Sequence, residues 1–268
     1  MNLLFEGLGL SEELVLHLET LGFTEPTPIQ VQAIPHLLAG RDVVGQAQTG
    51  TGKTAAFSLP ILERIDLDLT AVQALVLTPT RELAMQVTEA IRDLSGISSD
   101  GPVKVGRSLQ VLTVYGGQSI DRQMQRLKRG VHIVVGTPGR ILDMLSRGSL
   151  KLDKVKWLVL DEADEMLSMG FIQDVEKILD AAPKDRQTAF FSATMEASIR
   201  KLVVRHLRNP VNVTVEQPKA TPKRISQGVY MIPRGWSKAR ALQPILEMED
   251  PESALIFVRT RQSAAELT

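Results

Sequence analysis

Residues 47–54 read Ala-Gln-Thr-Gly-Thr-Gly-Lys-Thr, and residues 161–164 read Asp-Glu-Ala-Asp. In the first stretch, glycines allow backbone N–H groups to face phosphates, Lys53 supplies a positive charge, and Thr54 offers a hydroxyl to Mg²⁺. The second stretch follows the apolar run 157–160, which has the composition of a buried strand. A carboxylate at the end of such a strand is where a metal-bound nucleotide needs one. Together, the two stretches predict a site for a nucleoside triphosphate and Mg²⁺.

Three side chains of this predicted site have catalytic roles. Lys53 neutralises phosphate charge, Asp161 holds Mg²⁺ together with Thr54, and Glu162 orients or deprotonates the attacking water. An acidic first turn of a helix is the alternative interpretation of the two carboxylates. The strict phosphate-loop pattern begins with glycine, and this chain has alanine there. The residues expected around the phosphates are Ala47, Gln48, Thr49, Gly50, Thr51, Gly52, Lys53 and Thr54.

The composition is that of an ordinary globular protein, with 268 residues, 43% hydrophobic and 23% charged. There is no cysteine, which excludes a disulfide framework and a cysteine-based metal site and fits a cytoplasmic location. The first basic side chain is Arg41, so we expect neither a secretory signal nor a transit peptide. No apolar run is long enough to span a membrane. The formal net charge of zero argues against nonspecific coating of nucleic acid.

Short apolar runs alternate with amphipathic stretches such as 81–94 and 170–179. This alternation predicts an α/β fold with a doubly wound parallel sheet flanked by helices, in which ligands bind at the carboxyl ends of the strands. Two helices are expected before the first strand, and Thr27, Pro28 and Gln30 have the pattern of a helix start. The expected strands cover residues 43–44, 74–77, 109–114, 131–135, 157–160, 188–191 and 211–215.

The pattern changes after residue 215. Residues 216–224 contain two X-Pro pairs and three basic side chains, which predicts an exposed linker. A strand over 228–232, a helix over 239–248 and a strand over 254–258 are expected to follow. We therefore expect one full domain over 1–215 and the incomplete start of a second domain over 225–268.

Several further stretches have two interpretations on the residues alone. Gln30 completes a helix-capping box with Thr27, and its amide can equally read an adenine, with Phe23 stacking on the base. The stretches 79–84, 116–117 and 137–140 each follow an expected strand and combine turn residues with phosphate donors. The Ser192-Ala193-Thr194 stretch is explained by helix capping or by a link to the nucleotide site.

The order of these stretches resembles that of the DEAD-box ATP-dependent RNA helicases over essentially the whole chain. Phe5, Gly22-Phe23 and residues 26–30 resemble the adenine-reading Q motif, which implies that Phe23 and Gln30 contact ATP. Residues 47–54 match the family's form of the phosphate loop, with alanine in its first position. Residues 254–260 resemble the first motif of a second RecA-like lobe.

The resemblance implies a RecA-like P-loop NTPase domain that uses ATP and Mg²⁺ and binds single-stranded or short duplex RNA. It also implies that Asp164, Ser192 and Thr194 communicate between ATP and RNA. The implied RNA-binding residues are Pro79, Thr80, Arg81, Gly116, Gly117, Gln123, Arg126, Thr137, Pro138, Gly139 and Arg140.

The family's second lobe supplies arginine fingers from a His-Arg-x-Gly-Arg-x-Gly-Arg string, which is absent from these 268 residues. Because an arginine finger contributes roughly 10³–10⁵ in rate, we expect a helicase fragment with weak turnover by itself. Its expected partners are RNA and either the missing second lobe or another copy of the chain. The alternative is a non-catalytic, nucleotide-gated adaptor. A DNA translocase and a GTPase are disfavoured, the latter because no Asn-Lys-x-Asp string occurs.

Overall fold

The computed structural model describes residues 4–96, 108–215, 226 and 228–267. The chain divides into two compact units, Met1–Gln217 and Pro218–Thr268. The predicted linker over 216–224 lies outside the described residues. Each unit is therefore described by itself.

The first unit is built on a parallel sheet of seven strands in the order β3-β4-β2-β5-β6-β1-β7. The predicted α/β fold with a parallel sheet is confirmed. The central strands are apolar at every position and fully buried, as expected for a sheet covered on both faces. The strands are β1 Val43–Gln46, β2 Ala74–Leu77, β3 Val111–Val114, β4 Ile133–Gly136, β5 Trp157–Leu160, β6 Gln187–Ser192 and β7 Val211–Thr214.

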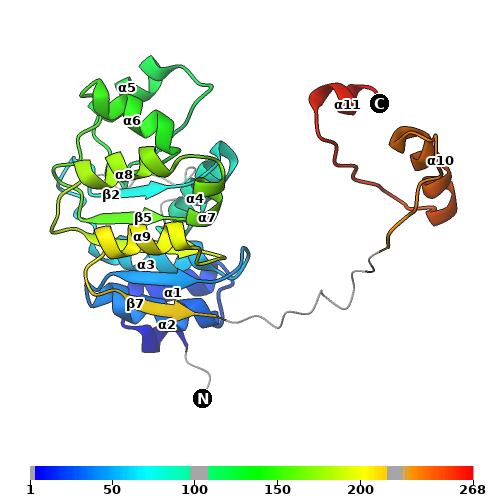
Figure 1. Cartoon of the computed structure of the whole chain (residues 1–268). Coiled ribbons are helices and arrows are strands. Elements are labelled where there is room, and N and C mark those ends of the chain that lie inside the picture. Colours follow the sequence, from blue (N-terminus) through cyan, green and yellow to red (C-terminus); the bar gives the residue numbers. More distant parts are fainter. Residues whose placement is uncertain (1–3, 97–107, 216–225, 227, 268) are drawn as a thin grey trace. The chain divides into compact units, whose positions relative to one another are not determined.

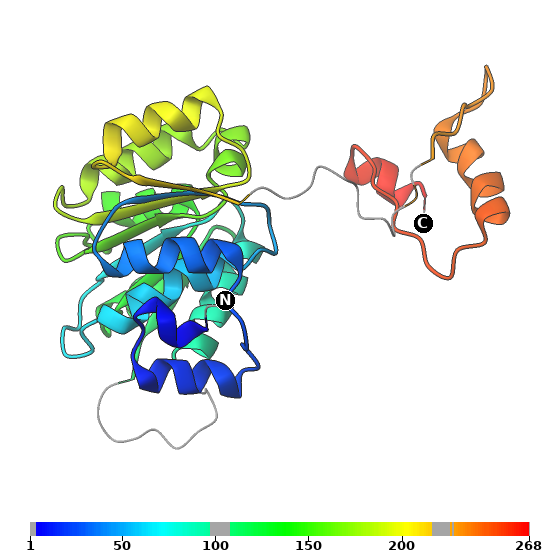
Figure 2. The ribbon, with the colours of Figure 1, turned by 90° about the horizontal axis from the view of Figure 1, so that it is seen from below.

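Helices cover both faces of this sheet (Figure 1). One face packs against α2 (Pro28–Leu38), α3 (Lys53–Arg64) and α4 (Arg81–Leu94). An outer layer of η1 (Phe5–Leu8) and α1 (Glu12–Thr20) packs on α2 and α3, and Figure 2 shows these layers from below. The opposite face packs against α5 Ile120–Lys128, α6 Pro138–Ser146, α7 Ala163–Ser168, α8 Ile172–Ala181 and α9 Ala197–His206.

Two helix N-caps fix where the loops at the carboxyl edge of the sheet end. The backbone N–H of Thr27 donates to the side-chain oxygen of Gln30 at 2.8 Å, as the predicted capping pattern at Pro28 requires. At the start of α4, the hydroxyl of Thr80 accepts from the backbone N–H of Leu83 at 3.2 Å. Both caps end a loop at a defined residue, so the loops that precede them are held in place.

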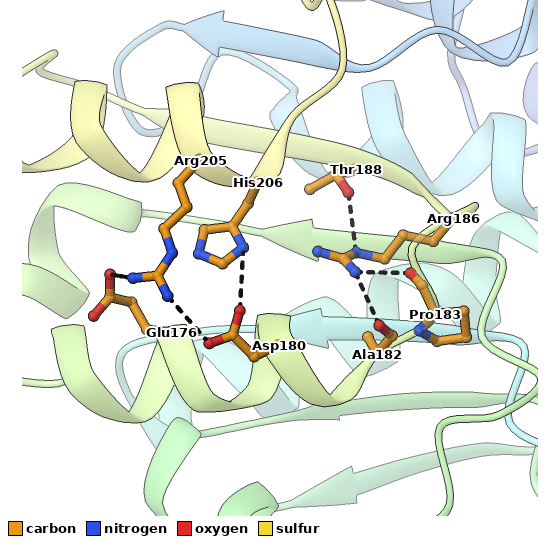
Figure 3. Close-up of polar contacts among 8 residues, drawn as sticks. All are labelled: Glu176, Asp180, Ala182, Pro183, Arg186, Thr188, Arg205 and His206. Carbon is orange, nitrogen blue, oxygen red and sulfur yellow. Dashed lines mark hydrogen bonds and ion pairs between the residues drawn. The ribbon is translucent and has the colours of Figure 1, made fainter.

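Polar contacts hold the amino end of β6, opposite the predicted site, and connect two neighbouring helices (Figure 3). Arg186 is 6% exposed, and its guanidinium donates to the carbonyl of Pro183 at 2.8 Å. Burial lowers the pKa of this guanidinium. On the adjacent surface, Arg205 of α9 contacts Glu176 at 3.0 Å and Asp180 at 3.5 Å, both on α8. These contacts join α8 and α9 into one layer.

The second unit has helices but no strand among its described residues. The helix expected over 239–248 is present as α10 (Lys238–Glu249), followed by α11 (Arg261–Ala265). The strands predicted over 228–232 and 254–258 are wrong, since neither segment pairs with a neighbour. A strand is stabilised by its partners, and without them Val229 and Phe257 remain 91% and 88% exposed.

Candidate functional site

The strand order sorts the singled-out stretches into two neighbouring groups at the carboxyl edge of the sheet. β5, β6 and β1 are adjacent, which brings together the stretches 47–54, 161–164 and 192–194. β3, β4 and β2 are also adjacent, which does the same for the loops at 79–81, 116–117 and 137–140. The sheet therefore forms two polar regions side by side along one edge.

The phosphate-loop stretch connects β1 to α3. Gly50 and Gly52 have φ values of 81° and 89°, which L side chains rarely adopt, and Gly52 is the N-cap of α3. The hydroxyl of Thr51 donates to the carbonyl of Gln48 at 2.7 Å and closes the turn. The loop thus ends at a helix N-terminus, where backbone N–H groups and the helix dipole favour an anion.

Two opposite charges are buried below this loop. Lys53 is 5% exposed and Asp161 is 2% exposed. Within the described residues, Lys53 Nζ and Asp161 Oδ1 have no hydrogen-bond partner. Burial raises the pKa of Asp161 to about 6, although the charge of Lys53 acts in the opposite direction. Buried charges without partners are costly, so the pair fits a site whose remaining partners are an anion for Lys53 and a cation for Asp161.

The donor set fits Mg²⁺ better than a metal held by the protein alone. In the described residues, no group of three or more His, Cys, Asp or Glu side chains could hold a metal. Mg²⁺ keeps several waters and is usually bound by one or two carboxylates plus substrate phosphates. Asp161 at the end of β5, with the Thr54 hydroxyl in the first turn of α3, provides such a partial set.

Glu162 has a strained backbone. Its φ and ψ of 55° and 53° are left-handed, a conformation that costs a non-glycine residue about 1–3 kcal/mol and is concentrated at functional sites. Its carboxylate accepts a hydrogen bond from the hydroxyl of Thr49 at 2.9 Å. The turn therefore directs Glu162 to the phosphate loop. This contact could not be predicted from the sequence, because 113 residues separate the two positions.

Asp164 lies against the 192–194 stretch. Its Oδ2 accepts from the backbone N–H of Thr194 at 2.8 Å and from the Thr194 hydroxyl at 3.0 Å. The Ser192 hydroxyl donates to the carbonyl of Thr194 at 2.6 Å. Burial opposes ionisation of Asp164, but the hydrogen bonds from Thr194 counteract it and the pKa is lowered. The three residues that resemble the family's coupling motifs are therefore in direct contact.

Gln30 joins α2 to the phosphate loop. It is 2% exposed, and its amide nitrogen donates to the carbonyl of Gly52 at 3.1 Å while its oxygen caps Thr27. The capping interpretation of Gln30 is thus correct, and the same side chain also contacts the loop. The ring of Phe23 packs edge-on against Phe5, with centroids 6.3 Å apart.

The second polar region is held by contacts between its own loops. Arg140 donates to the carbonyl of Gln118 at 3.1 Å, which fastens the start of α6 to the loop after β3. A side chain added at Gly116 or Gly117 would meet nothing within 4 Å, so the backbone there is open to a ligand. Pro79, Thr80, Arg81, Thr137, Pro138 and Gly139 lie in the neighbouring loops and first helical turns.

The two α5 residues predicted to bind RNA differ in exposure. Gln123 is 4% exposed, and its amide nitrogen donates to the carbonyl of Tyr115 at 3.1 Å. Arg126, one turn later, is exposed. Gln123 therefore holds the strand end that precedes Gly116 and faces the interior. Sequence reasoning missed Gln118 and Tyr115, which carry these contacts and form no recognisable motif.

A family model described as DEAD/DEAH box helicase matches residues 27–202. The chain belongs to the DEAD/DEAH box helicase family. It is 60% identical over 264 residues to "RNA helicase CrhR" of Synechocystis, a match that covers 98% of this chain and 52% of that protein. It is 50% identical to "ATP-dependent RNA helicase DeaD" of Escherichia coli K12, covering 98% of this chain and 40% of DeaD. The chain thus spans about half the length of the curated relatives it matches.

Solved structures give the same family. A DEAD box protein from Methanococcus jannaschii superposes with a TM-score of 0.74 at 43% identity, over 80% of this chain and 56% of that one. A hypothetical ATP-dependent RNA helicase from Sulfolobus tokodaii gives 0.67 at 38% identity, over 77% and 57%. Among the described residues, no helix has the length and apolar character that a membrane span requires.

Proposed function

We propose that the chain is the nucleotide-binding lobe of a cytoplasmic ATP-dependent RNA helicase of the DEAD-box type. ATP hydrolysis would drive local RNA unwinding or remodelling of RNA–protein complexes. The single observation that carries the proposal is the buried pair of Lys53 and Asp161 below the phosphate loop, each with a polar atom that lacks a partner among the described residues. The names of CrhR and DeaD support RNA as the substrate class.

At the nucleotide site, Lys53 and the loop backbone N–H groups hold the phosphates, and Thr54 and Asp161 hold Mg²⁺. The ion supplies charge neutralisation to the phosphates when it is bound. Glu162, fixed by Thr49, orients the attacking water and accepts its proton. Gln30 reads the adenine, and its bond to Gly52 ties that contact to the phosphate loop.

At the second region, the RNA backbone lies on the loops after β2, β3 and β4. Thr80 and Thr137 at helix N-termini donate to phosphates, and Gly116 and Gly117 allow close backbone approach. Asp164, bonded to Thr194 within the nucleotide-side group, communicates between ATP and RNA in this proposal. Residues 1–215 form this ATP-binding domain in the proposal, 216–224 the interlobe linker, and 225–268 the start of the second helicase domain.

ATP binding and hydrolysis by the chain, with and without oligouridylate, test this proposal beside a Glu162→Gln variant. We expect both proteins to bind Mg·ATP, because Glu162 contacts neither the phosphates nor the ion in this scheme. Hydrolysis by wild type, whatever its rate, should be reduced in the variant. No binding of ATP to wild type, or equal hydrolysis by both proteins, would refute the proposal.

A further inference from the structure

A basic hollow lies beside β3, next to the loops described above. It has a volume of about 430 Å³ and lies between α4, β3 and α5. That volume is within the range of about 300–1,000 Å³ of small-ligand sites. Its lining includes three positively charged side chains, Arg92, Arg122 and Arg126, and one negatively charged side chain, Glu89.

The arginines of the hollow are available to an anion. Arg122 and Arg126 are exposed on α5, and their guanidinium groups make no hydrogen bond or ion pair with any other described residue. Arg92 is anchored, since its Nη2 donates to the carbonyl of Val111 at 2.9 Å. A guanidinium has five N–H donors, so this one bond orients Arg92 and leaves other donors for a ligand. Planar guanidinium groups match phosphate oxygens in geometry and charge.

The edge strand itself is protected against pairing with another strand. Among the described residues β3 is the last strand of the sheet on this side, and Leu112 and Thr113 of β3 line the hollow. Arg92 covers the carbonyl of Val111, and Gln123 covers that of Tyr115 at 3.1 Å. Side chains that block an edge disfavour addition of an extended peptide. The charge of the hollow therefore favours a phosphate-bearing strand over a protein strand.

The hollow continues from the proposed RNA-binding loops. At the end of the hollow nearest those loops, the Tyr115 hydroxyl accepts a hydrogen bond from Gln118 Nε2 at 2.6 Å, and the Gln118 carbonyl accepts one from Arg140. From Val111 to Tyr115 the strand rises about 13 Å, which is the length of edge available below Gly116. An RNA strand that leaves the loops at Gly116 and Gly117 would enter the hollow directly.

We infer that this hollow is an additional phosphodiester-binding site, which extends the RNA path along the β3 edge through Arg92 and Arg122. The inference rests on the proposed RNA-binding function and adds Arg92 and Arg122, which belong to none of its motifs, to the Gln123 and Arg126 that also line the hollow. Short RNA would occupy the loops alone, and longer RNA would also fill the hollow. The two arginines should therefore affect only the longer ligand.

The test compares binding of labelled oligouridylates of about 4 and about 16 nucleotides, the range of site sizes found in single-strand binders. The proteins are the full chain, Arg122→Gln, Arg92→Gln, and Arg129→Gln as the control. Arg129 follows α5, is exposed and does not line the hollow, so its variant has the same change in charge. Affinities are measured over a series of salt concentrations, and thermal melts report any loss of folding.

For the longer RNA, each hollow variant should lose about 0.7 from the slope of log affinity against log salt, the value for one phosphate contact on a single strand. If wild type and variant bind equally at 1 M salt, that change in slope lowers the affinity of the variant about fivefold at about 0.1 M salt. Binding of the short RNA should not change, and Arg129→Gln should resemble wild type.

Three results would overturn the inference. An unchanged affinity of Arg122→Gln for the longer RNA would refute the hollow while the proposed function stands. Equal losses in Arg122→Gln and Arg129→Gln would indicate a general charge effect. Binding of neither RNA by wild type would refute the proposed function itself, and the hollow with it.

Discussion

Asp161→Asn should make the chain more stable at neutral pH when nucleotide and Mg²⁺ are absent. Burial raises the pKa of Asp161 from 3.8 to about 6. Because the folded chain holds this proton more tightly than the unfolded chain, stability from this group falls as pH rises from about 4 to about 6 and stays low above it. Asparagine has a similar shape and no charge, so it avoids this loss.

The magnitude follows from the shift. A difference of about two pKa units at about 1.4 kcal/mol each amounts to about 3 kcal/mol at pH 7. For a domain of this size, that corresponds to an increase in Tm of roughly 6–12 °C. At about pH 4 the difference between wild type and variant should be much smaller, since the Asp161 carboxyl is then protonated in the folded chain and partly protonated in the unfolded chain.

The assay is urea unfolding followed by circular dichroism at both pH values, in EDTA and without nucleotide. Asp164→Asn is the matched control, because the pKa of Asp164 is lowered and its carboxylate accepts two bonds from Thr194. That variant should be less stable at pH 7. An Asp161→Asn variant that gains nothing at pH 7, or gains equally at both pH values, would refute the reasoning.

Three further predictions concern the loop and its neighbours. Gly52→Ala should destabilise the chain by more than Gly50→Ala in urea unfolding. Both glycines have a positive φ, which costs an alanine about 1–2 kcal/mol. Only at Gly52 would the new Cβ also lie 2.4 Å from Gln30 Nε2. Gln30→Ala should cost about 1–3 kcal/mol by the same assay and weaken ATP binding, whereas Gln32→Ala on the exposed face of α2 should change neither. Thr194→Val removes one of two bonds to the Asp164 carboxylate, so RNA stimulation of hydrolysis should fall while the affinity for ATP, measured by titration, stays the same.

The sheet could be predicted well because its strands are buried on both faces. The apolar runs 74–77 and 157–160 match β2 and β5 residue for residue, and 81–94 matches α4. Apolar composition also predicted strands at 228–232 and 254–258, and both predictions are wrong. Those segments have the composition of strands, but composition does not supply the neighbour that pairing requires.

The site residues were predictable as types and the contacts between them were not. A carboxylate after an apolar strand identifies Asp161, yet only the fold shows that it is buried with Lys53. The left-handed turn at Glu162 has no sequence signal, because glutamate rarely adopts it. Likewise, the spacing of Gln123 and Arg126 gives no indication that one is buried against Tyr115 and the other exposed.

Calorimetric titration of Mg·ATP into the chain tests the central claim most directly. Wild type should bind one nucleotide, with an affinity that falls when Mg²⁺ is removed. Lys53→Ala should weaken binding by about 10- to 150-fold, the equivalent of one charged hydrogen bond at about 1.5–3 kcal/mol. Lys201→Ala, an exposed lysine on α9, is the control and should bind as wild type does. Equal affinity of wild type and Lys53→Ala, or no dependence on Mg²⁺, would contradict the account.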